Sequence, residues 1–211
     1  MMRRVLISIV LVCLLNIGFA YAKPSTDHPR HQVIVWTTRY KGTIFRVIKF
    51  PHCQHVETIF TNCPPGETRK QVKDRLGGFA SSTACFYNRN TLLPVDFFRK
   101  SGKVYVGREV GRSVLAIRED GRLEITKDYD FLQSDATIDA LALGSLISPF
   151  SLDGFTSDFA NLITDRMSLA ISPKYIYLVQ ANTSLWKMSQ FVEVRLPCDM
   201  AINTDGGHSV K

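Results

Sequence analysis

The chain has 211 residues, enough for one domain or two small ones, and a formal net charge of +7 from 26 basic and 19 acidic residues. This excess of positive charge suits an anionic ligand such as a phosphate, an acidic glycan or a membrane surface. The basic residues occur in runs no longer than two, and no aromatic-basic platform appears. The composition therefore argues against a nucleic-acid-binding protein.

The first 22 residues have the pattern of a secretory signal peptide. Arg3 and Arg4 precede the apolar stretch 5–20, and Ala20-Tyr21-Ala22 is a small-x-small cleavage site. The alternative is an uncleaved signal anchor, but the apolar stretch is short for a membrane-spanning helix. We therefore predict a secreted or periplasmic protein that has no stable membrane span after cleavage.

Strand and helix signals alternate along the rest of the chain, which divides into a leader with a first strand (23–41) and a folded domain (42–211). Runs of β-branched and aromatic residues predict strands at 32–37, 42–50, 104–106, 113–117, 123–125, 167–171 and 175–179. Helices are predicted at 67–75, 134–143, 157–163 and 185–194. This mixture predicts a single-domain α+β fold, with a mixed twisted sheet and short flanking helices.

Export would place the cysteines in an oxidising compartment. Cys13 leaves with the signal peptide, and the even number that remains favours disulfide bonds among Cys53, Cys63, Cys85 and Cys198. We favour the short loop Cys53–Cys63, which leaves Cys85 with Cys198. The alternative is a metal site at His52, Cys53, His55 and Cys63, but their spacing lacks the Cys-x-x-Cys pair of standard zinc sites. We expect neither a metal nor a cofactor.

Two segments of the chain repeat one pattern. Arg112-Ser-Val-Leu-Ala-Ile117 is matched by Arg166-Met-Ser-Leu-Ala-Ile171, and a turn and a second strand follow each copy. Two similar hairpins are the simplest explanation. Each copy also places an arginine at the mouth of a buried strand, where two guanidinium groups can bind one phosphate through bidentate hydrogen bonds.

The chain ends in AINTDGGHSVK, residues 201–211. Ala201 and Ile202 indicate the end of a buried strand, and Gly206 and Gly207 permit a tight turn or the close approach of a ligand. The polar side chains around these glycines can all hydrogen-bond a polar ligand: Asn203, Asp205, His208 and Ser209. Composition alone also fits an ordinary polar tail.

A series of short segments resembles the phosphodiester glycosidase family, which includes N-acetylglucosamine-1-phosphodiester alpha-N-acetylglucosaminidase-like domains. The segments are GGF at 77–79, LGSLI at 143–147, DRMSLAISPKYIYLV at 165–179, a helix, and AINTDGG at 201–207. Family members read approximately NGGFF, QSGPLL, PRTAIG, a helix and NLDGGGS in the same order. The likeness spans residues 42–209 and is that of a divergent or shortened member, with departures at Leu76, Ala80, Ala142, Ser145, Thr204 and His208.

The resemblance implies a hydrolase that cleaves a glycosyl phosphodiester or a related cell-surface glycan. Its leaving group, a phosphate, is already a stable anion, so a nearby cation helps more than a strong acid. Arg166 matches the family arginine and Asp205 the family aspartate, which would act as base, nucleophile or stabiliser of an oxocarbenium-like transition state. Glycoside cleavage usually uses a second carboxylate, and the sequence leaves it open among Asp96, Asp153 and Glu109.

The remaining residues of the predicted site would bind a glycan or sugar-phosphate ligand. They are Gly77, Gly78, Arg112, Gly144, Asn203, Gly206, Gly207 and Ser209. Backbone N–H groups of the last glycine pair would approach the sugar or phosphate. A non-catalytic glycan-binding or scaffold protein on the same fold is the alternative, because Leu76 and Ala142 replace the asparagine and glutamine of the motifs. The sequence does not reveal the oligomeric state.

Overall fold

The computed structural model describes residues 33–51, 94–107, 111–128 and 137–205. It also describes the isolated positions Lys70, Gln71, Asp74, Phe86, Asp130 and Leu132. For three further strands it gives the backbone alone: β1 (Ile7–Val12), β2 (Gly18–Tyr21) and β5 (Glu57–Thr61), which form a sheet in the order β2-β1-β5. The predicted signal peptide therefore overlaps β1 and β2, and its cleavage stays a prediction.

The largest sheet has six antiparallel strands in the order β11-β14-β12-β13-β4-β3. Their bounds are β3 (Ile34–Tyr40), β4 (Thr43–Pro51), β11 (Leu146–Ser148), β12 (Thr164–Ile171), β13 (Tyr175–Thr183) and β14 (Met200–Thr204). These segments are rich in β-branched and aromatic residues, which suit a pleated and half-buried surface. The neighbouring strands β12 and β14 carry predicted site residues.

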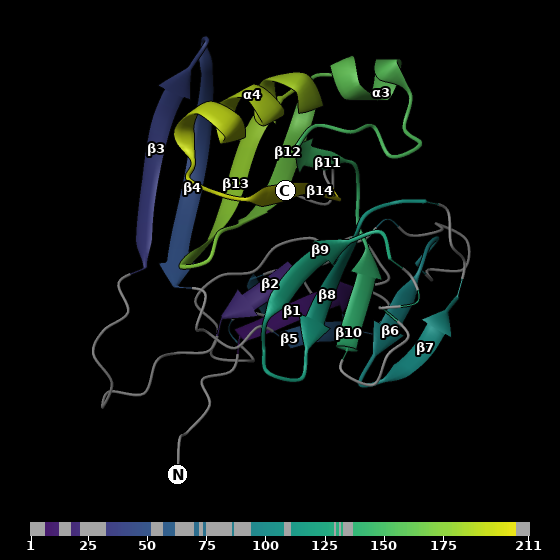
Figure 1. Ribbon diagram of the computed structural model, residues 1–211. Coiled ribbons are helices and arrows are strands. Elements are labelled where there is room, and N and C mark those ends of the chain that lie inside the picture. The colour runs from purple at the N-terminus through teal and green to yellow at the C-terminus, as the bar shows by residue number, and fades with distance from the viewer. Residues whose placement is uncertain are drawn as a thin grey trace.

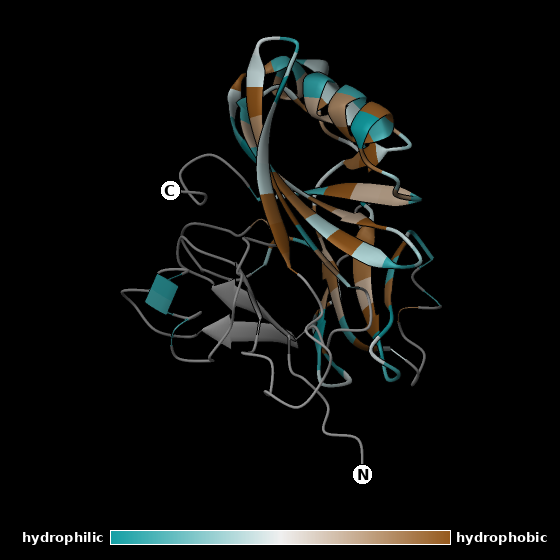
Figure 2. Cartoon of the chain, turned by 90° about the vertical axis from the view of Figure 1, so that its left-hand side faces the viewer, coloured by the Kyte–Doolittle hydropathy of each residue, from teal (hydrophilic) through white to brown (hydrophobic). Residues whose placement is uncertain are grey.

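Helix α4 (Leu185–Arg195) covers one face of this sheet (Figure 1). The helix begins at Ser184, whose side chain accepts a hydrogen bond of 3.2 Å from the Lys187 N–H. Its buried residues recur on one side, and Phe191 stacks on Phe45 of β4 with ring centroids 4.0 Å apart. Figure 2 shows the resulting mixture of hydrophobic and hydrophilic positions along α4. A second helix on this side, α3 (Ser157–Asn161), has only five residues.

A five-stranded antiparallel sheet lies below the first in Figure 1, in the order β7-β6-β10-β8-β9. Its strands are β6 (Phe98–Lys100), β7 (Lys103–Val106), β8 (Val114–Arg118), β9 (Leu123–Thr126) and β10 (Thr137–Ala142). Six buried residues form its core: Phe97, Val114, Ala116, Leu132, Ala140 and Ala142. Strands β9 and β14 bring the two sheets into contact.

The helix predicted at 134–143 is wrong, because residues 137–142 form β10 in the middle of this sheet. The helix was predicted from an N-cap pattern with Asp135 and Asp139 near its start, and such a local signal does not reveal that β10 pairs with β6 on one side and β8 on the other. The β-branched pair Thr137-Ile138 was the available signal for a strand. Strand β6 was not predicted at all.

The α+β fold class is confirmed, with the refinement that the strands are divided between separate sheets. The other predicted strands and the helices at 157–163 and 185–194 are also confirmed, within a few residues. Of the predicted helix at 67–75, the described positions Lys70, Gln71 and Asp74 are helical. Within the described ranges, no helix combines the length and hydrophobicity needed to cross a bilayer.

Candidate functional site

Arg166 lies near the start of β12 and is only 2% exposed. Its guanidinium donates hydrogen bonds to the backbone carbonyls of Phe159 (2.7 Å) and Leu162 (3.1 Å), at the end of α3. The same group lies 4.4 Å from the centroid of the Phe159 ring. Burial lowers the pKa of Arg166 from its usual value. The guanidinium nevertheless stays charged at neutral pH, so β12 carries a buried cation.

Asp205 follows the last residue of β14 and is 8% exposed. Strands β12 and β14 are antiparallel, and the register pairs Ser168 with Asn203 and Met167 with Thr204. One further step in this register would place Asp205 opposite Arg166. Residues that are opposite each other in an antiparallel pair direct their side chains to the same face of the sheet. The observed pairing ends at Met167 and Thr204, so the convergence of Arg166 and Asp205 on one site stays a prediction.

Gly144 and Asn203 are in close contact where the segment before β11 meets β14. The Gly144 N–H donates to the Asn203 carbonyl at 2.8 Å. A Cβ atom on Gly144 would lie 2.7 Å from both the Asn203 backbone oxygen and its side-chain nitrogen, closer than real Cβ contacts. Glycine is therefore required here to leave room for the Asn203 amide, which is 1% exposed.

We expect Gly144→Ala to destabilise the protein by about 1–3 kcal/mol, because the added methyl group meets backbone that cannot move freely. Urea unfolding would measure the change. The control is Gly107→Ala, where a Cβ would meet Val104 at an ordinary 3.8 Å; the expected change is within about 0.5 kcal/mol. Equal stability of the two variants would contradict the close contact at Gly144.

Arg112 precedes β8 and lies beside the same group of aromatic rings as Arg166. Its guanidinium forms an ion pair with Asp96 and lies 4.4 Å from the Phe155 ring centroid. Phe155 and Phe159 stack on each other with centroids 4.7 Å apart. Each arginine thus lies over a different ring of one stacked pair. The sharing of one phosphate by both arginines stays a prediction, because the charge of Arg112 is balanced by Asp96.

Asp153, one of the open choices for the second carboxylate, is fully engaged in structural hydrogen bonds. Its oxygens accept from the hydroxyls of Ser113 and Ser151 (both 2.6 Å), from the Leu146 N–H (3.2 Å) and from the Lys127 ammonium. Burial opposes its ionisation, yet these hydrogen bonds hold the pKa of Asp153 below its usual value. Asp153 therefore ties the β8–β9 hairpin to β11. Glu109, another choice, lies outside the described residues.

Several predicted site residues also lie outside the described residues: Gly77, Gly78, Gly206, Gly207 and Ser209. The same holds for Cys53, Cys63, Cys85 and the alternative metal ligands His52 and His55. Cys198 is described, and it has a free thiol whose pKa is raised to about 11, mainly by burial. The structure therefore does not show the predicted pairing of Cys85 with Cys198. The described part of the chain contains no cluster of three or more His, Cys, Asp or Glu side chains that could hold a metal.

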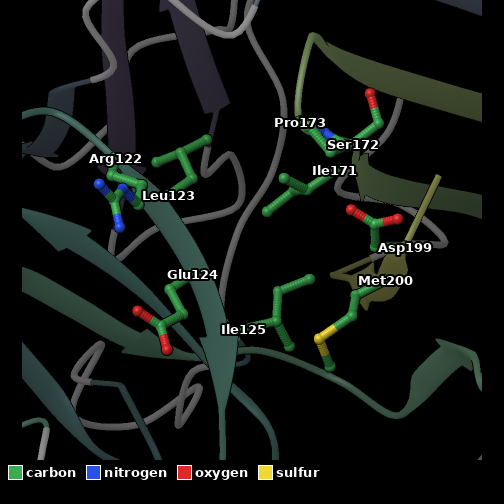
Figure 3. A pocket seen from close by; sticks show the side chains of 9 residues that line it. All are labelled: Arg122, Leu123, Glu124, Ile125, Ile171, Ser172, Pro173, Asp199 and Met200. Carbon is green, nitrogen blue, oxygen red and sulfur yellow. The ribbon is translucent and has the colours of Figure 1, made fainter.

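A cavity of about 200 Å³ lies at the other end of β12 and β14 from the predicted site (Figure 3). Its walls are mainly apolar, with charged groups at the edge: Arg122, Leu123, Glu124, Ile125, Ile171, Ser172, Pro173, Asp199 and Met200. None of the predicted site residues lines it. The cavity lies between β9 and the β12–β14 pair, so we interpret it as incomplete packing between the two sheets.

The sequence analysis missed two kinds of residue at the site. Phe155 and Phe159 are four positions apart, a spacing that brings side chains to one side of a helical turn and was available as a signal. Ser145 was noted only as a departure from a motif. Its hydroxyl is buried and has no hydrogen-bond partner in the described part of the chain, which the sequence could not indicate.

The comparison with solved structures shows which fold holds this site. The catalytic domain of zebrafish N-acetylglucosamine-1-phosphodiester alpha-N-acetylglucosaminidase, in a form auto-inhibited by its pro-peptide, is similar over 90% of this chain and 75% of that chain, with a TM-score of 0.56 and 12% sequence identity. This chain shares the fold of a glycosidase catalytic domain.

A hypothetical protein from Synechocystis is also similar, with a TM-score of 0.57 and 12% identity. The match covers 86% of this chain and 59% of that protein. At this level of identity the two likenesses establish the fold alone. No protein-family model and no curated protein sequence matches the chain.

Proposed function

We propose that the protein is a hydrolase of glycosyl phosphodiesters, in which Arg166 binds the phosphate and Asp205 acts on the sugar. The observation that carries this proposal is the burial of the Arg166 guanidinium and the set of neutral groups that it contacts. This guanidinium is a buried cation that contacts two backbone carbonyls and an aromatic ring, on the strand that pairs with β14, the strand that Asp205 follows. Buried charges without an opposite charge are costly and concentrate at functional sites.

The surroundings of Arg166 suit a phosphate ligand. A guanidinium binds phosphate through two parallel hydrogen bonds, and such charge-assisted bonds are stronger than bonds to neutral carbonyls. A phosphodiester can therefore displace the carbonyls of Phe159 and Leu162 from the guanidinium. In a site from which water is excluded, the cation then stabilises the negative charge on the departing phosphate.

The available carboxylates also fit this chemistry. Asp96 is paired with Arg112, and Asp153 accepts hydrogen bonds from four groups. Neither is free to donate a proton to a leaving group. A phosphate leaving group needs no such proton, because it departs as a stable anion. Asp205 can therefore act without a partner acid, as base, as nucleophile or by stabilising positive charge on the sugar.

The test is an assay of the purified protein with an N-acetylglucosamine 1-phosphodiester, with a 4-nitrophenyl glycoside as the comparison substrate. Arg166→Lys keeps the charge but loses the planar pair of donors, so kcat/KM for the phosphodiester should fall by about 10²-fold or more. The control is Arg195→Lys, because Arg195 lies over the Tyr40 ring at the far end of α4 and should not affect turnover.

The outcomes separate the two candidate functions. Turnover of the phosphodiester that depends on Arg166 supports the hydrolase. Binding of the phosphodiester without turnover would instead favour the non-catalytic glycan-binding alternative on the same fold. Equal activity of the Arg166→Lys and Arg195→Lys variants would refute the role given to Arg166.

A further inference from the structure

Strand β3 is the last strand of the six-stranded sheet, and among the strands that the structure describes it pairs with β4 alone. Figure 1 shows β3 at the outer edge of this sheet. The strand has seven residues, most of them β-branched or aromatic, and contains no proline. An edge strand of this length and composition offers backbone groups to which a further strand can be added.

The turn between β3 and β4 determines which backbone groups of β3 point outward. Lys41 and Gly42 form a two-residue hairpin loop with φ angles of 44° and 80°, and the residues on either side of the loop pair with each other. In such a hairpin the pair that flanks the loop exchanges both of its hydrogen bonds, and bonded and non-bonded pairs then alternate along the strands. The N–H and C=O groups of three residues therefore point away from β4: Val35, Thr37 and Arg39.

One face of this edge is exposed and basic. The register pairs Arg39 with Ile44 and Thr37 with Arg46, and all four side chains are exposed. Phe45, which lies between Ile44 and Arg46 in β4, packs on α4 instead. Neighbouring side chains of a strand point to opposite faces, so the two arginines lie on the face that is turned away from α4.

The arginines of this face have neutral neighbours in the sheet. Arg46 lies between Thr37 of β3 and Gln180 of β13 in the register. Residues 33–51 include four basic side chains and no acidic one. Within the described part of the chain, neither arginine forms an ion pair. Two exposed guanidinium groups can therefore bind carboxylates that a partner supplies.

We propose that β3 binds an extended segment of a partner protein as a seventh strand, in which acidic and apolar residues alternate. The backbone of the segment pairs with the outward N–H and C=O groups of β3. Its carboxylates lie on the face of Arg39 and Arg46. Its apolar side chains lie on the other face, beside Ile34, which is 40% exposed, and beside Trp36 and Tyr40, which pack against the core under α4. Strands β4 and β13 separate this edge from β12, so the inference does not rest on the proposed function.

Charge argues against a second copy of this chain as the occupant. Two β3 edges that pair with each other would bring together Arg39 and Arg46 of both copies, with no acidic residue on either β3 or β4. Like charges on neighbouring strands are destabilising, whereas opposite charges stabilise the pairing. An acidic strand therefore suits this edge better than a copy of the edge itself.

The experiment measures binding of labelled peptides to the purified protein by fluorescence anisotropy. The probe is a peptide of the length of β3 in which glutamate and valine alternate. One control peptide replaces each glutamate by lysine, and a second has the composition of the probe but places glutamates and valines in pairs. Only the alternating acidic peptide should bind, and its affinity should fall as the salt concentration rises.

Arg39→Glu tests the charge of the edge. It should weaken binding of the acidic peptide about fivefold, since an attraction between exposed charges becomes a repulsion. It should also allow the lysine peptide to bind. The matched control is Lys174→Glu, which makes the same change of charge at an exposed position in the turn between β12 and β13. This variant should bind the acidic peptide as the wild type does.

Thr37→Pro tests the backbone of the edge. Proline removes an N–H that points away from β4, and an edge strand tolerates this loss because its pairing inside the sheet is kept. The variant should bind the acidic peptide about tenfold more weakly and should melt within a few degrees of the wild type. Thr37→Ala keeps the N–H and is the control, with affinity close to that of the wild type.

Four results would overturn the inference. If the paired acidic peptide binds as tightly as the alternating one, charge acts without strand pairing. If Thr37→Pro binds as well as Thr37→Ala, the peptide does not use the backbone of β3. If Arg39→Glu binds as well as Lys174→Glu, the edge does not select acidic residues. If the wild type binds none of the peptides, the arginines serve only to protect the edge from aggregation, and the proposed hydrolase activity is unaffected.

Discussion

Asp205→Asn should reduce turnover of a glycosyl phosphodiester by about 10³-fold or more, within the range expected for a carboxylate that takes part in the reaction. The amide keeps the shape of the side chain but can neither accept a proton nor attack or stabilise a cationic sugar carbon. Binding of N-acetylglucosamine 1-phosphate should change much less, because in the proposed function Arg166 makes the main contact with the phosphate.

The matched control is Asp165→Asn. Asp165 immediately precedes Arg166, and its carboxylate accepts a hydrogen bond of 2.9 Å from the Asn182 amide. In a strand, alternate side chains point to opposite faces, so Asp165 faces away from the site. Its substitution should leave kcat unchanged. Retention of wild-type kcat by Asp205→Asn would remove Asp205 from the reaction and leave the fold likeness without a catalytic residue.

Asp153→Ala should destabilise the protein by about 3–5 kcal/mol, the usual result of removing one partner from a buried charged network. The loss leaves the buried Ser113 hydroxyl and the Leu146 N–H without their acceptor. Alanine is also strained at this position, where φ is +49°. Urea unfolding at pH 7 would measure the effect, with Asp120→Asn as the control, since Asp120 is exposed and accepts locally from the Arg122 N–H.

Asp153→Asn tests the electrostatic part of this network, because asparagine tolerates the same backbone conformation. The pKa of Asp153 is lower in the folded protein than in the unfolded chain. Its contribution to stability is therefore complete above the unfolded pKa, which is about 4, and is lost as the pH falls through the folded value. The stability difference between the wild type and Asp153→Asn should be largest near neutral pH and should shrink in acid. A difference that is independent of pH would show that the charge of Asp153 is not involved.

The sequence was a good guide to the six-stranded sheet because its strands follow local rules. Strands β12 and β13 are long, β-branched and separated by a short turn, and α4 begins at a clear N-cap, Ser184. β10 could not be predicted in the same way, because its residues also fit the start of a helix and only its pairing with β6 and β8 makes it a strand. A local sequence pattern does not show which distant segments will cover a strand.

At the candidate site, too, some residues were identified from short sequence motifs, whereas others depend on contacts between segments far apart in the sequence. Arg166, Asp205 and Asn203 were found through motifs, and the structure places them on the neighbouring strands β12 and β14 or directly after β14. The interaction of Arg166 with α3 and the unpaired hydroxyl of Ser145 depend on contacts between segments that are not adjacent in the sequence. Such contacts leave no pattern in a single sequence.

The two backbone carbonyls that accept hydrogen bonds from Arg166 would compete with a ligand for its guanidinium. Helix α3 has five residues, too few to be stable in isolation, and the carbonyls of Phe159 and Leu162 are attached to the guanidinium at a high effective concentration. Any ligand must replace these two acceptors before it gains affinity. Phosphate oxygens carry a charge and can do so, whereas the neutral oxygens of an unphosphorylated sugar offer no advantage over a carbonyl. In the proposed function, the backbone of α3 would thereby set the discrimination between phosphorylated and plain glycans, without a residue that repels the wrong ligand.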